Sequence, residues 1–426
     1  MAEALKDSKV EWLGLIPESW SVERIGTLYS PRNTKVSDED YPPLSVTMQG
    51  ILPQLETVAK TDDHNNRKLV KKGDFAINSR SDRRGSCGIS DYDGSVSLIN
   101  TVLKPNAKMN PVYYNWLFHT SLFADEFYKW GHGIVDDLWT TNWQDMKNIF
   151  VTIPPLDEQE AIADFLDEKC AEVDKLSKSI QKQINILNDY KKSVITRVVT
   201  KGLNPKTKMK DSGINWIGEI PQDWTCKKIK YLADIKQNNS FVDGDWIESP
   251  FVKDNGIRYI TTGNIGDGMF KRQGDGYVSE EDFKMLRCKY AYPGDLIFSR
   301  LNEEYGRSCI LPNDYPKYVI AVDNVILRTE HDKRYICYCT QCPGYHDSVA
   351  DYARGTAMKR VSRVNLGNIS IPIPTPAEEI EIANYLDDKC SRINESISIK
   401  QEQIAKLDAY KKSIIYEYVT GKKRVA

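Results

Sequence analysis

IPPLDEQEAIADFLDEKC at residues 153–170 and IPTPAEEIEIANYLDDKC at residues 373–390 are two copies of one sequence element. They lie 220 residues apart (373 − 153 = 220), and the offset holds without a gap to DYKKSVI at 189–195 and AYKKSII at 409–415. A segment that recurs at a fixed offset marks a chain built from two copies of one structural unit. The sequence therefore predicts a fold with an internal pseudo-two-fold repeat.

Each copy of the element has the apolar spacing of a long amphipathic helix, with apolar residues at every third or fourth position. In the first copy this stripe comprises Ile162, Leu166, Val173, Leu176, Ile180, Leu187 and Val194, and in the second copy Ile382, Leu386, Ile393, Leu407 and Ile414. Prolines precede both helices, and Gly202 and Gly421 follow them as stop signals. We expect helices over about 156–200 and 376–420. Heptad-like spacing predicts that the two stripes bury each other in an intramolecular coiled coil, and the long chain between the helices permits antiparallel packing. The alternative is that each helix packs only on its own domain.

A second repeat lies upstream of each helix, where WLGLIPESW at 12–20 matches WIGEIPQDW at 216–224. Between these anchors the two halves diverge into short β-branched and aromatic runs separated by Gly, Pro, Asn and Asp, which is typical of strands and turns. In each half a single helix is expected after the central strands, over 113–131 and 334–355. We predict two α+β domains with mixed β-sheet and short helices, separated by the two long helices.

Composition limits the possible function. The chain has 426 residues, 40% hydrophobic and 28% charged, as expected of a soluble protein with two or more domains. The N-terminus does not read as a signal peptide, and no apolar run approaches the roughly 20 residues that span a bilayer, so we expect a cytoplasmic protein without membrane contact. The nine cysteines lack paired spacing and are expected to be reduced thiols. Because the net charge is −2, any binding of nucleic acid must depend on local basic patches.

Two such patches occur in predicted loops. SRSDRRGSCG at 79–88 follows a strand, and GTAMKRVSR at 355–363 follows the helix of the second domain. Arginine reads guanine and grips phosphate, and polar side chains in the same loops can read adenine. The alternative is that these are solvated surface charges. The full set of predicted DNA-contacting residues is Thr47, Gln49, Arg80, Arg83, Arg84, Thr262, Asn264, Arg300, Asn302, Thr356, Lys359 and Arg360.

Catalytic motifs are not found. A base methyltransferase needs a glycine-rich cofactor loop and an Asn/Asp-Pro-Pro-aromatic turn, and an ATP-driven motor needs GxxxxGK[ST]; none of these patterns occurs. Cys337, Cys339, Cys342 and His346 resemble a metal set, but residues two apart point to different faces of a helix. We expect no catalytic residue, no metal and no cofactor. The repeated Trp12, Trp20, Trp216 and Trp224 are interpreted as core residues.

These features resemble the specificity subunits of type I restriction-modification systems. The resemblance covers nearly the whole chain. It is carried by the W-x-G-x-I-P-x-x-W motifs that begin at residues 12 and 216, by LSVTMQG at 44–50, by YITTGNIGDG at 259–268 and by the prolines that precede each long helix. It implies that each variable domain is a target-recognition domain for one half of a split double-stranded DNA site. It also implies that the helices set the spacing and dock two methyltransferase subunits, and that motor-nuclease subunits complete the complex.

The resemblance divides the chain into target-recognition domain 1 (1–155), a central conserved region (156–212), target-recognition domain 2 (213–375) and a C-terminal conserved region (376–426). A helix of about 40 residues spans roughly 60 Å, and one DNA turn advances about 34 Å, so two half-sites about one turn apart are expected. Because the domains differ, the site should be asymmetric. One alternative is a non-catalytic coiled-coil scaffold for other proteins. Another is an autonomous modifying enzyme, which the missing motifs disfavour.

Overall fold

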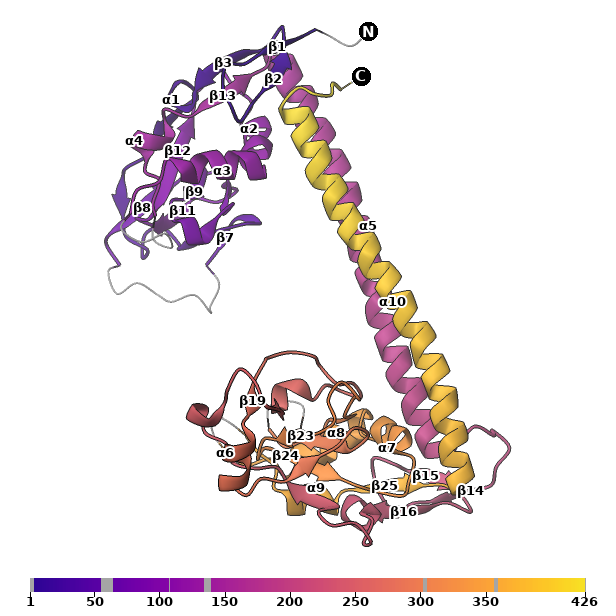
Figure 1. The fold of residues 1–426 in the computed structure, drawn as a ribbon. Helices are drawn as coiled ribbons and strands as arrows, with labels where there is room; N and C mark the ends of the chain where they lie inside the picture. Colours follow the sequence, from indigo (N-terminus) through magenta and orange to yellow (C-terminus); the bar gives the residue numbers. More distant parts are fainter. Residues whose placement is uncertain are drawn as a thin grey trace. The chain divides into compact units, whose positions relative to one another are not determined.

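The computed structural model describes residues 4–54, 64–106, 108–133, 139–301, 305–355 and 359–425. The chain divides into two compact units. Unit 1 comprises Met1–Gln181 and Glu402–Ala426, and unit 2 comprises Lys182–Gln401. The division falls inside the two long helices, so each unit contains one variable domain and one half of each long helix (Figure 1). Among the described residues, no helix combines the length and apolar character that crossing a membrane requires.

The two long helices are α5, Leu156–Lys201, and α10, Pro376–Val419. Their bounds agree with the ranges expected from the apolar spacing. Thr375 begins α10 with a reciprocal cap: its hydroxyl accepts from the backbone N–H of Glu378, whose carboxylate accepts from the backbone N–H of Thr375. Gly202 and Gly421 follow the two helices with a φ of +72° each, the left-handed conformation that ends a helix and that glycine adopts without strain.

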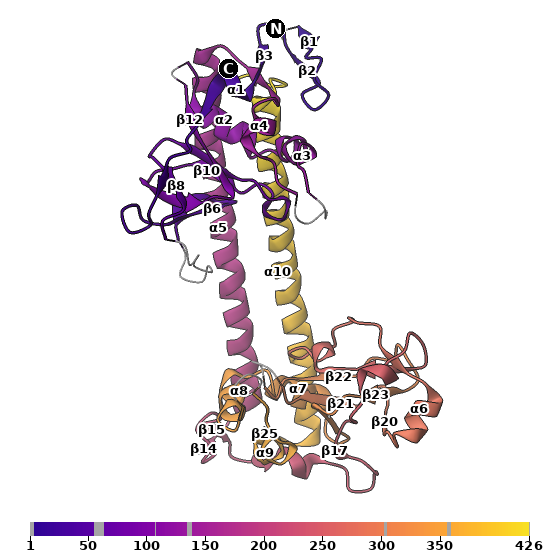
Figure 2. The same ribbon diagram turned by 90° about the vertical axis from the view of Figure 1, so that its left-hand side faces the viewer.

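The helices pair in opposite directions, which confirms the predicted antiparallel coiled coil. In unit 1 the late residue Lys411 of α10 donates to the early residue Asp174 of α5 at 2.7 Å. In unit 2 the late residue Lys191 of α5 donates to the early residue Asn394 of α10 at 3.0 Å. Figures 1 and 2 show the halves of α5 and α10 side by side within each unit.

One member of the predicted stripe is wrong. The spacing places Leu176 on the buried face, but its side chain is 50% exposed, while Ile184, outside the predicted set, is 4% exposed. The buried positions Val173, Ile180 and Ile184 follow a strict alternation of three and four residues, into which residue 177 fits and residue 176 does not. Position 177 is a serine, and the neighbouring Leu176 is apolar. An assignment based on apolar residues alone therefore places Leu176 on the buried face by mistake.

Among the described residues of unit 1, every pair of named strands is antiparallel, and one isolated parallel bridge joins Pro43 to Ser95. The main sheets of this unit have the orders β10-β9-β12-β4 and β11-β8-β5, with the smaller pairs β13-β3, β6-β7 and β1-β2. The strands are β1 Leu5–Asp7, β2 Leu15–Pro17, β3 Ser21–Arg24, β4 Tyr29–Pro31, β5 Lys35–Val36, β6 Leu44–Thr47, β7 Gly50–Pro53, β8 Arg67–Val70, β9 Phe75–Asn78, β10 Cys87–Ile89, β11 Gly94–Ser97, β12 Asn100–Pro105 and β13 Phe150–Ile153. The short helices are α1 Ile25–Leu28, η1 Ser81–Arg83, α2 Pro111–Phe118, α3 Ser121–Lys129 and α4 Trp143–Met146.

Unit 2 repeats this plan and adds one parallel pair, β18 with β23. Its sheets have the orders β17-β24-β21-β22, β19-β18-β23-β20, β16-β25 and β14-β15. The strands are β14 Met209–Asp211, β15 Glu219–Pro221, β16 Thr225–Lys228, β17 Phe241–Asp243, β18 Ile257–Ile260, β19 Tyr277–Val278, β20 Tyr290–Ala291, β21 Leu296–Ser299, β22 Ser308–Ile310, β23 Tyr318–Ile320, β24 Asn324–Leu327 and β25 Ser370–Ile373. The short helices are η3 Ile229–Leu232, η4 Ser249–Phe251, η5 Thr262–Asn264, α6 Glu280–Met285, α7 Lys333–Cys339, α8 Pro343–Ala350 and α9 Arg363–Asn368.

The single helix expected in each variable domain is in fact two. In unit 1, Thr120 separates α2 from α3 because its hydroxyl accepts from the backbone N–H of Phe123 and so starts a new helix. In unit 2, Pro343 stands at the first position of α8, where its missing N–H costs nothing, and α7 ends before it. Local capping overrides the continuous apolar pattern at both places.

The same joint attaches each variable domain to the long helices. Trp20 and Trp224 are 1% exposed, and their indole N–H groups donate to Glu158 at 2.9 Å and Glu378 at 3.4 Å. The repeated tryptophans at these positions are therefore core residues. A tyrosine at the start of α2 or α7 adds a second link to the far helix. The Tyr113 hydroxyl donates to the Val419 carbonyl at 2.8 Å, and the Tyr335 hydroxyl donates to the Val199 carbonyl at 3.2 Å.

Candidate nucleic-acid interface

In both units, the loop after a central strand lies against a turn that follows the second short helix. In unit 1, β9 is paired on both sides by β10 and β12, and Arg80, just beyond its end, bridges to Thr140. In unit 2, β21 is paired by β22 and β24, and Leu301 bridges to Arg360. Such loops run over the surface of a rigid sheet, which suits them for binding. The fold thus brings together segments that lie about sixty residues apart in the sequence.

Three arginines gather on the unit 1 loop. Arg80 pairs with Asp82 at 2.9 Å, Arg83 lies 3.8 Å from the same carboxylate, and Arg84 pairs with Asp125 of α3. The side chains of the arginines are 40%, 68% and 50% exposed, respectively. The arginines predicted from the sequence are therefore accessible, but each has an aspartate beside it.

The unit 2 cluster is assembled from separate elements. Arg300 is buried, with its side chain 8% exposed, and it lies 3.2 Å from Asp243 of β17. Arg360 pairs with Asp323, and Arg363 of α9 pairs with Asp243 at 3.0 Å. Burial lowers the pKa of the Arg300 guanidinium, and the carboxylates of Asp243 and Asp323 oppose that effect. The cluster therefore holds three arginines on two carboxylates.

Sequence reasoning missed both aspartates and did not include Arg363 among the expected contacts. Asp243 ends β17 and Asp323 precedes β24, and these strands pair with each other beside β21. The sequence has nearly equal numbers of basic and acidic residues, 58 and 60, so acidic partners for the arginines are available, but the counts do not identify them. Which aspartate meets which arginine depends on strand order.

The remaining predicted residues lie in several places. Thr47 and Gln49 are in the β6–β7 turn, where the Thr47 hydroxyl donates to the Gly50 carbonyl at 2.9 Å and Gln49 is exposed. Lys359 is exposed next to Arg360. Thr262 begins η5, and its carbonyl accepts from Arg307 at 3.1 Å. Predicted contacts at Asn302 and Thr356 lie outside the described residues.

Asn264 has a structural position. Its side chain is 2% exposed, and its amide nitrogen donates to the carbonyls of Lys271 at 3.1 Å and Gln273 at 2.7 Å. Its amide oxygen accepts from the backbone N–H of Thr261 at 2.9 Å. Because both ends of the amide are engaged inside the loop, Asn264 shapes the 261–273 segment and presents no free group on the surface.

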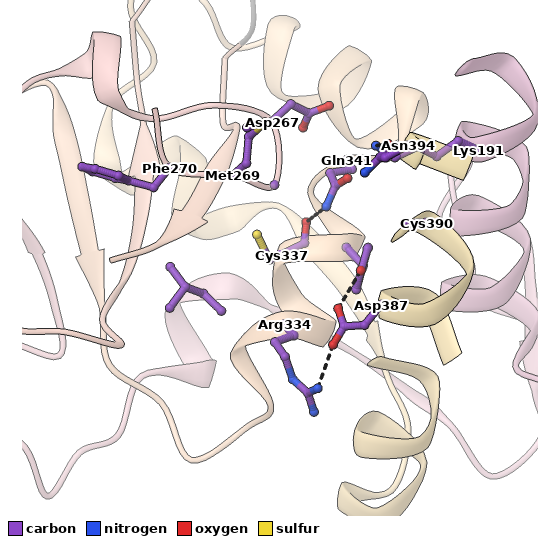
Figure 3. Close-up of a pocket in the computed structure, with 13 residues that line it drawn as sticks. Lys191, Asp267, Met269, Phe270, Arg334, Cys337, Gln341, Asp387, Cys390 and Asn394 are labelled. Carbon is purple, nitrogen blue, oxygen red and sulfur yellow. Dashed lines mark hydrogen bonds and ion pairs between the residues drawn. The ribbon is translucent and has the colours of Figure 1, made fainter. Parts of the chain in front are cut away.

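A cavity of about 220 Å³ lies in unit 2 where α7 meets the long helices (Figure 3). Arg334 and Tyr338 of α7 both bond to Asp387 of α10, at 2.8 Å and 2.7 Å. None of the predicted DNA-contacting residues lines it. Arg334 and Asp387 pair with each other, and Lys191 of α5 donates to Asn394 of α10, so the cavity belongs to the joint between the variable domain and the helices.

The cysteines and histidine that resemble a metal set are divided between two helices. Cys337 and Cys339 lie in α7 and His346 in α8, with Cys342 at the turn between them. The three cysteines are buried and free. The Cys337 thiol lies against Ser308, and His346 Nδ1 faces the carbonyl of Tyr305 at 3.1 Å. Within the described ranges, no group of three potential metal ligands converges.

Comparison with known proteins gives consistent matches. The model of the type I restriction modification DNA specificity domain matches residues 24–186 and again 221–407. The type I restriction enzyme MjaVIII specificity subunit of Methanocaldococcus jannaschii is 25% identical, over 96% of this chain and 94% of that protein. The EcoDI specificity subunit of Escherichia coli is 20% identical over 57% of this chain and 55% of that protein.

A solved chain from work on complex assembly and conformational transition of the type I restriction-modification system shares the fold. Its TM-score is 0.72 at 14% identity, over 96% of this chain and 99% of that chain. The family match spans both repeats and more than half of the residues. The chain therefore belongs to the type I restriction modification DNA specificity family, as a specificity subunit that is itself non-catalytic.

Proposed function

We propose that this subunit reads an asymmetric bipartite DNA sequence, one half-site with each variable domain. One observation carries the proposal: the two units place different side chains at the same point of the same scaffold. Arg80, Arg83 and Arg84 follow β9 on one continuous turn, whereas Arg300 follows β21 and Arg360 and Arg363 come from a second segment. Repeated scaffold with unlike surface chemistry is what reading two unlike half-sites requires.

The functional division of the chain follows the sequence segments. Residues 1–155 and 213–375 act as the two target-recognition domains, and 156–212 and 376–426 act as the conserved regions. The proposed DNA contacts include the exposed Gln49, Arg83, Arg84, Lys359 and Arg360. The proposed set is completed by Thr47, Arg80, Thr262, Arg300, Asn302 and Thr356. Asn264 contributes by holding its loop in shape.

The paired helices set the spacer between half-sites and seat two methyltransferase subunits, and motor-nuclease subunits join the restricting complex in the cytoplasm. The pseudo-two-fold repeat supports two similar docking surfaces. Tyr190 of α5 and Tyr410 of α10 occupy equivalent positions, 220 residues apart, and are 47% and 53% exposed. Matched exposed aromatics on both helices are typical of interface residues.

Mapping of methylated positions in random DNA treated with the reconstituted complex tests the proposal. Two unlike half-sites with a constant spacer are expected. Arg84→Glu should weaken recognition of one half-site and Arg360→Glu of the other, each by about tenfold or more. Lys72→Glu, which reverses an exposed charge outside both clusters, is the control. If both arginine reversals left DNA affinity and the methylated motif unchanged, the chain would instead be a protein-interaction scaffold.

A further inference from the structure

Both the backbone and the side chain of Arg360 are held. Its N–H donates to the Arg354 carbonyl at 2.8 Å, and its carbonyl accepts from the Arg354 N–H at 3.0 Å. On the other side, the next residue along, Val361, donates to the Arg300 carbonyl at 3.0 Å. The segment is thus tied between two others, and Cα of Arg360 has little freedom to move.

The partly buried carboxylate of Asp323 holds the side chain of Arg360. Asp323 pairs with Nη2 of Arg360, and its Oδ1 atom is fully buried, although the guanidinium side chain is 46% exposed. The backbone of Asp323 is fixed in turn, because its carbonyl accepts from the Arg300 N–H at 2.8 Å. An ordinary surface ion pair lets both long side chains move and contributes little. Here one partner lies in the turn that leads into β24 and the other projects into solvent.

Such an arrangement suits reading of a base more than attraction of phosphate. A guanidinium has five N–H donors, so one carboxylate does not exhaust them. The aspartate also cancels the charge that phosphate binding needs, while fixing the orientation that a bidentate contact to guanine needs. A side chain ordered before binding loses less entropy when it binds.

We propose that Asp323 is a positioning residue that orients Arg360 to recognise a guanine in the half-site read by unit 2. This inference rests on the proposed DNA-reading function. Asp323 itself touches no DNA and acts through Arg360. The neighbouring pair of Arg363 with Asp243 has the more exposed carboxylate, 36% against 20% for Asp323.

The test uses the complex of this subunit with its methyltransferase partner and compares D323N with D314N. Asp314 pairs with Arg272 at 2.8 Å elsewhere in unit 2, so D314N removes the same charge from a solvent-facing pair. The affinity for the cognate duplex, for duplexes changed at each single position, and for random duplex is measured at two salt concentrations. Thermal unfolding of both variants establishes that each remains folded.

For D323N we expect discrimination at one base position to fall about tenfold, with the other positions unchanged. Affinity for random duplex should rise about threefold at low salt, because a negative charge near the DNA is lost. D314N should keep full discrimination, and D323E should restore most of it. R360K keeps the charge but lacks the planar fork, and it should lose discrimination at that same position.

Two results would overturn the inference. One is that D323N weakens all sequences equally, which indicates a purely structural role. The other is that D323N retains full discrimination while R360K loses it, which shows that Arg360 needs no orienting carboxylate. A wild-type complex without any sequence preference would instead contradict the proposed function itself, and that outcome is visible before any variant is made.

Discussion

The joints of the two units share one geometry and differ in charge. In unit 1, Gln159 of α5 accepts from the backbone N–H of Asn110, which starts α2. In unit 2, Glu379 of α10 accepts from the backbone N–H of Asp332, which starts α7, and also contacts His331 at 2.6 Å. Asn110 and Gln159 of unit 1 carry amides, whereas the equivalent Asp332 and Glu379 of unit 2 carry carboxylates. The backbone geometry therefore sets where these side chains lie within the joint. The charge of a side chain can differ between the units if a neighbouring residue, here His331, offers it a hydrogen-bonding partner.

The largest expected effect tests whether the two joints are equally important. Trp20→Ala and Trp224→Ala each remove a fully buried indole and should destabilise their own unit by about 3–5 kcal/mol. Hydrogen exchange read by peptide separates the units, which a single melting curve does not. Trp246→Ala is the control, since that side chain is 66% exposed and should cost less than about 0.5 kcal/mol. Equal loss of protection in both units from one variant would show that they unfold together.

A second pair of variants tests the difference in charge. Glu379→Ala leaves His331 and the Asp332 N–H without their buried acceptor and should cost about 3 kcal/mol. Gln159→Ala removes two neutral bonds, to Asn110 and to the Pro154 carbonyl, and should cost about 2 kcal/mol. Glu379→Gln introduces the residue that unit 1 has at this position, and it should destabilise the protein less than either alanine variant. Denaturant dependence of exchange in each unit gives the three values, and a larger loss for Gln159→Ala would contradict the comparison.

The third prediction concerns pH. His119 in unit 1 has a lowered pKa because it is buried, with hydrogen bonds to Asn115 and Cys87 opposing the effect; the equivalent residue in unit 2 is Gln341. As the pH falls, His119 therefore takes up a proton at a higher pH in the unfolded chain than in the folded one. Unit 1 should lose stability as the pH falls below about 6.5, by about 1.4 kcal/mol per pKa unit of lowering.

His119→Gln should remove this loss from unit 1 and leave the pH dependence of unit 2 as it was. Hydrogen exchange of the two units between pH 7.5 and pH 5, corrected for intrinsic exchange, provides the measurement. An unchanged acid sensitivity of unit 1 in the variant would mean that another group in that unit is responsible.

The smallest expected change in stability comes from the two equivalent contacts between α5 and α10, one in each unit. Lys411 meets a carboxylate, Asp174, where the equivalent Lys191 meets an amide, Asn394. Asp174→Asn should cost less than about 0.5 kcal/mol and abolish the salt dependence of that contact, and Asn394→Asp should create the same salt dependence in unit 2. Chemical denaturation in urea at low and high salt measures both. A loss above 1 kcal/mol at high salt would show that Asp174 has a packing role.

The sequence predicted the parts of the fold that depend on local pattern. The repeat and the two long helices with their ends at proline and glycine follow from spacing along the chain, and the long connection between the helices permits their antiparallel pairing. It failed where a local cap interrupts a pattern, as at Thr120, and where an apolar residue lies one position off the seam, as at Leu176. Both failures involve one residue whose hydrogen bond or register outweighs the average of its neighbours.

The candidate site divides in the same way. Arg80, Arg83, Arg84 and Arg360 could be nominated from the sequence because arginine in a polar loop after a strand is a local signal. The sequence by itself thus determined a duplicated scaffold, with unlike arginine-rich loops on its two domains. Only the tertiary structure decided that Asp323 lies beneath Arg360, that Arg300 is buried and that Asn264 faces inward. The pairs of Arg360 with Asp323 and of Arg300 with Asp243 join segments far apart in the chain, and an ion pair or a buried amide depends on distances that no spacing along the sequence records.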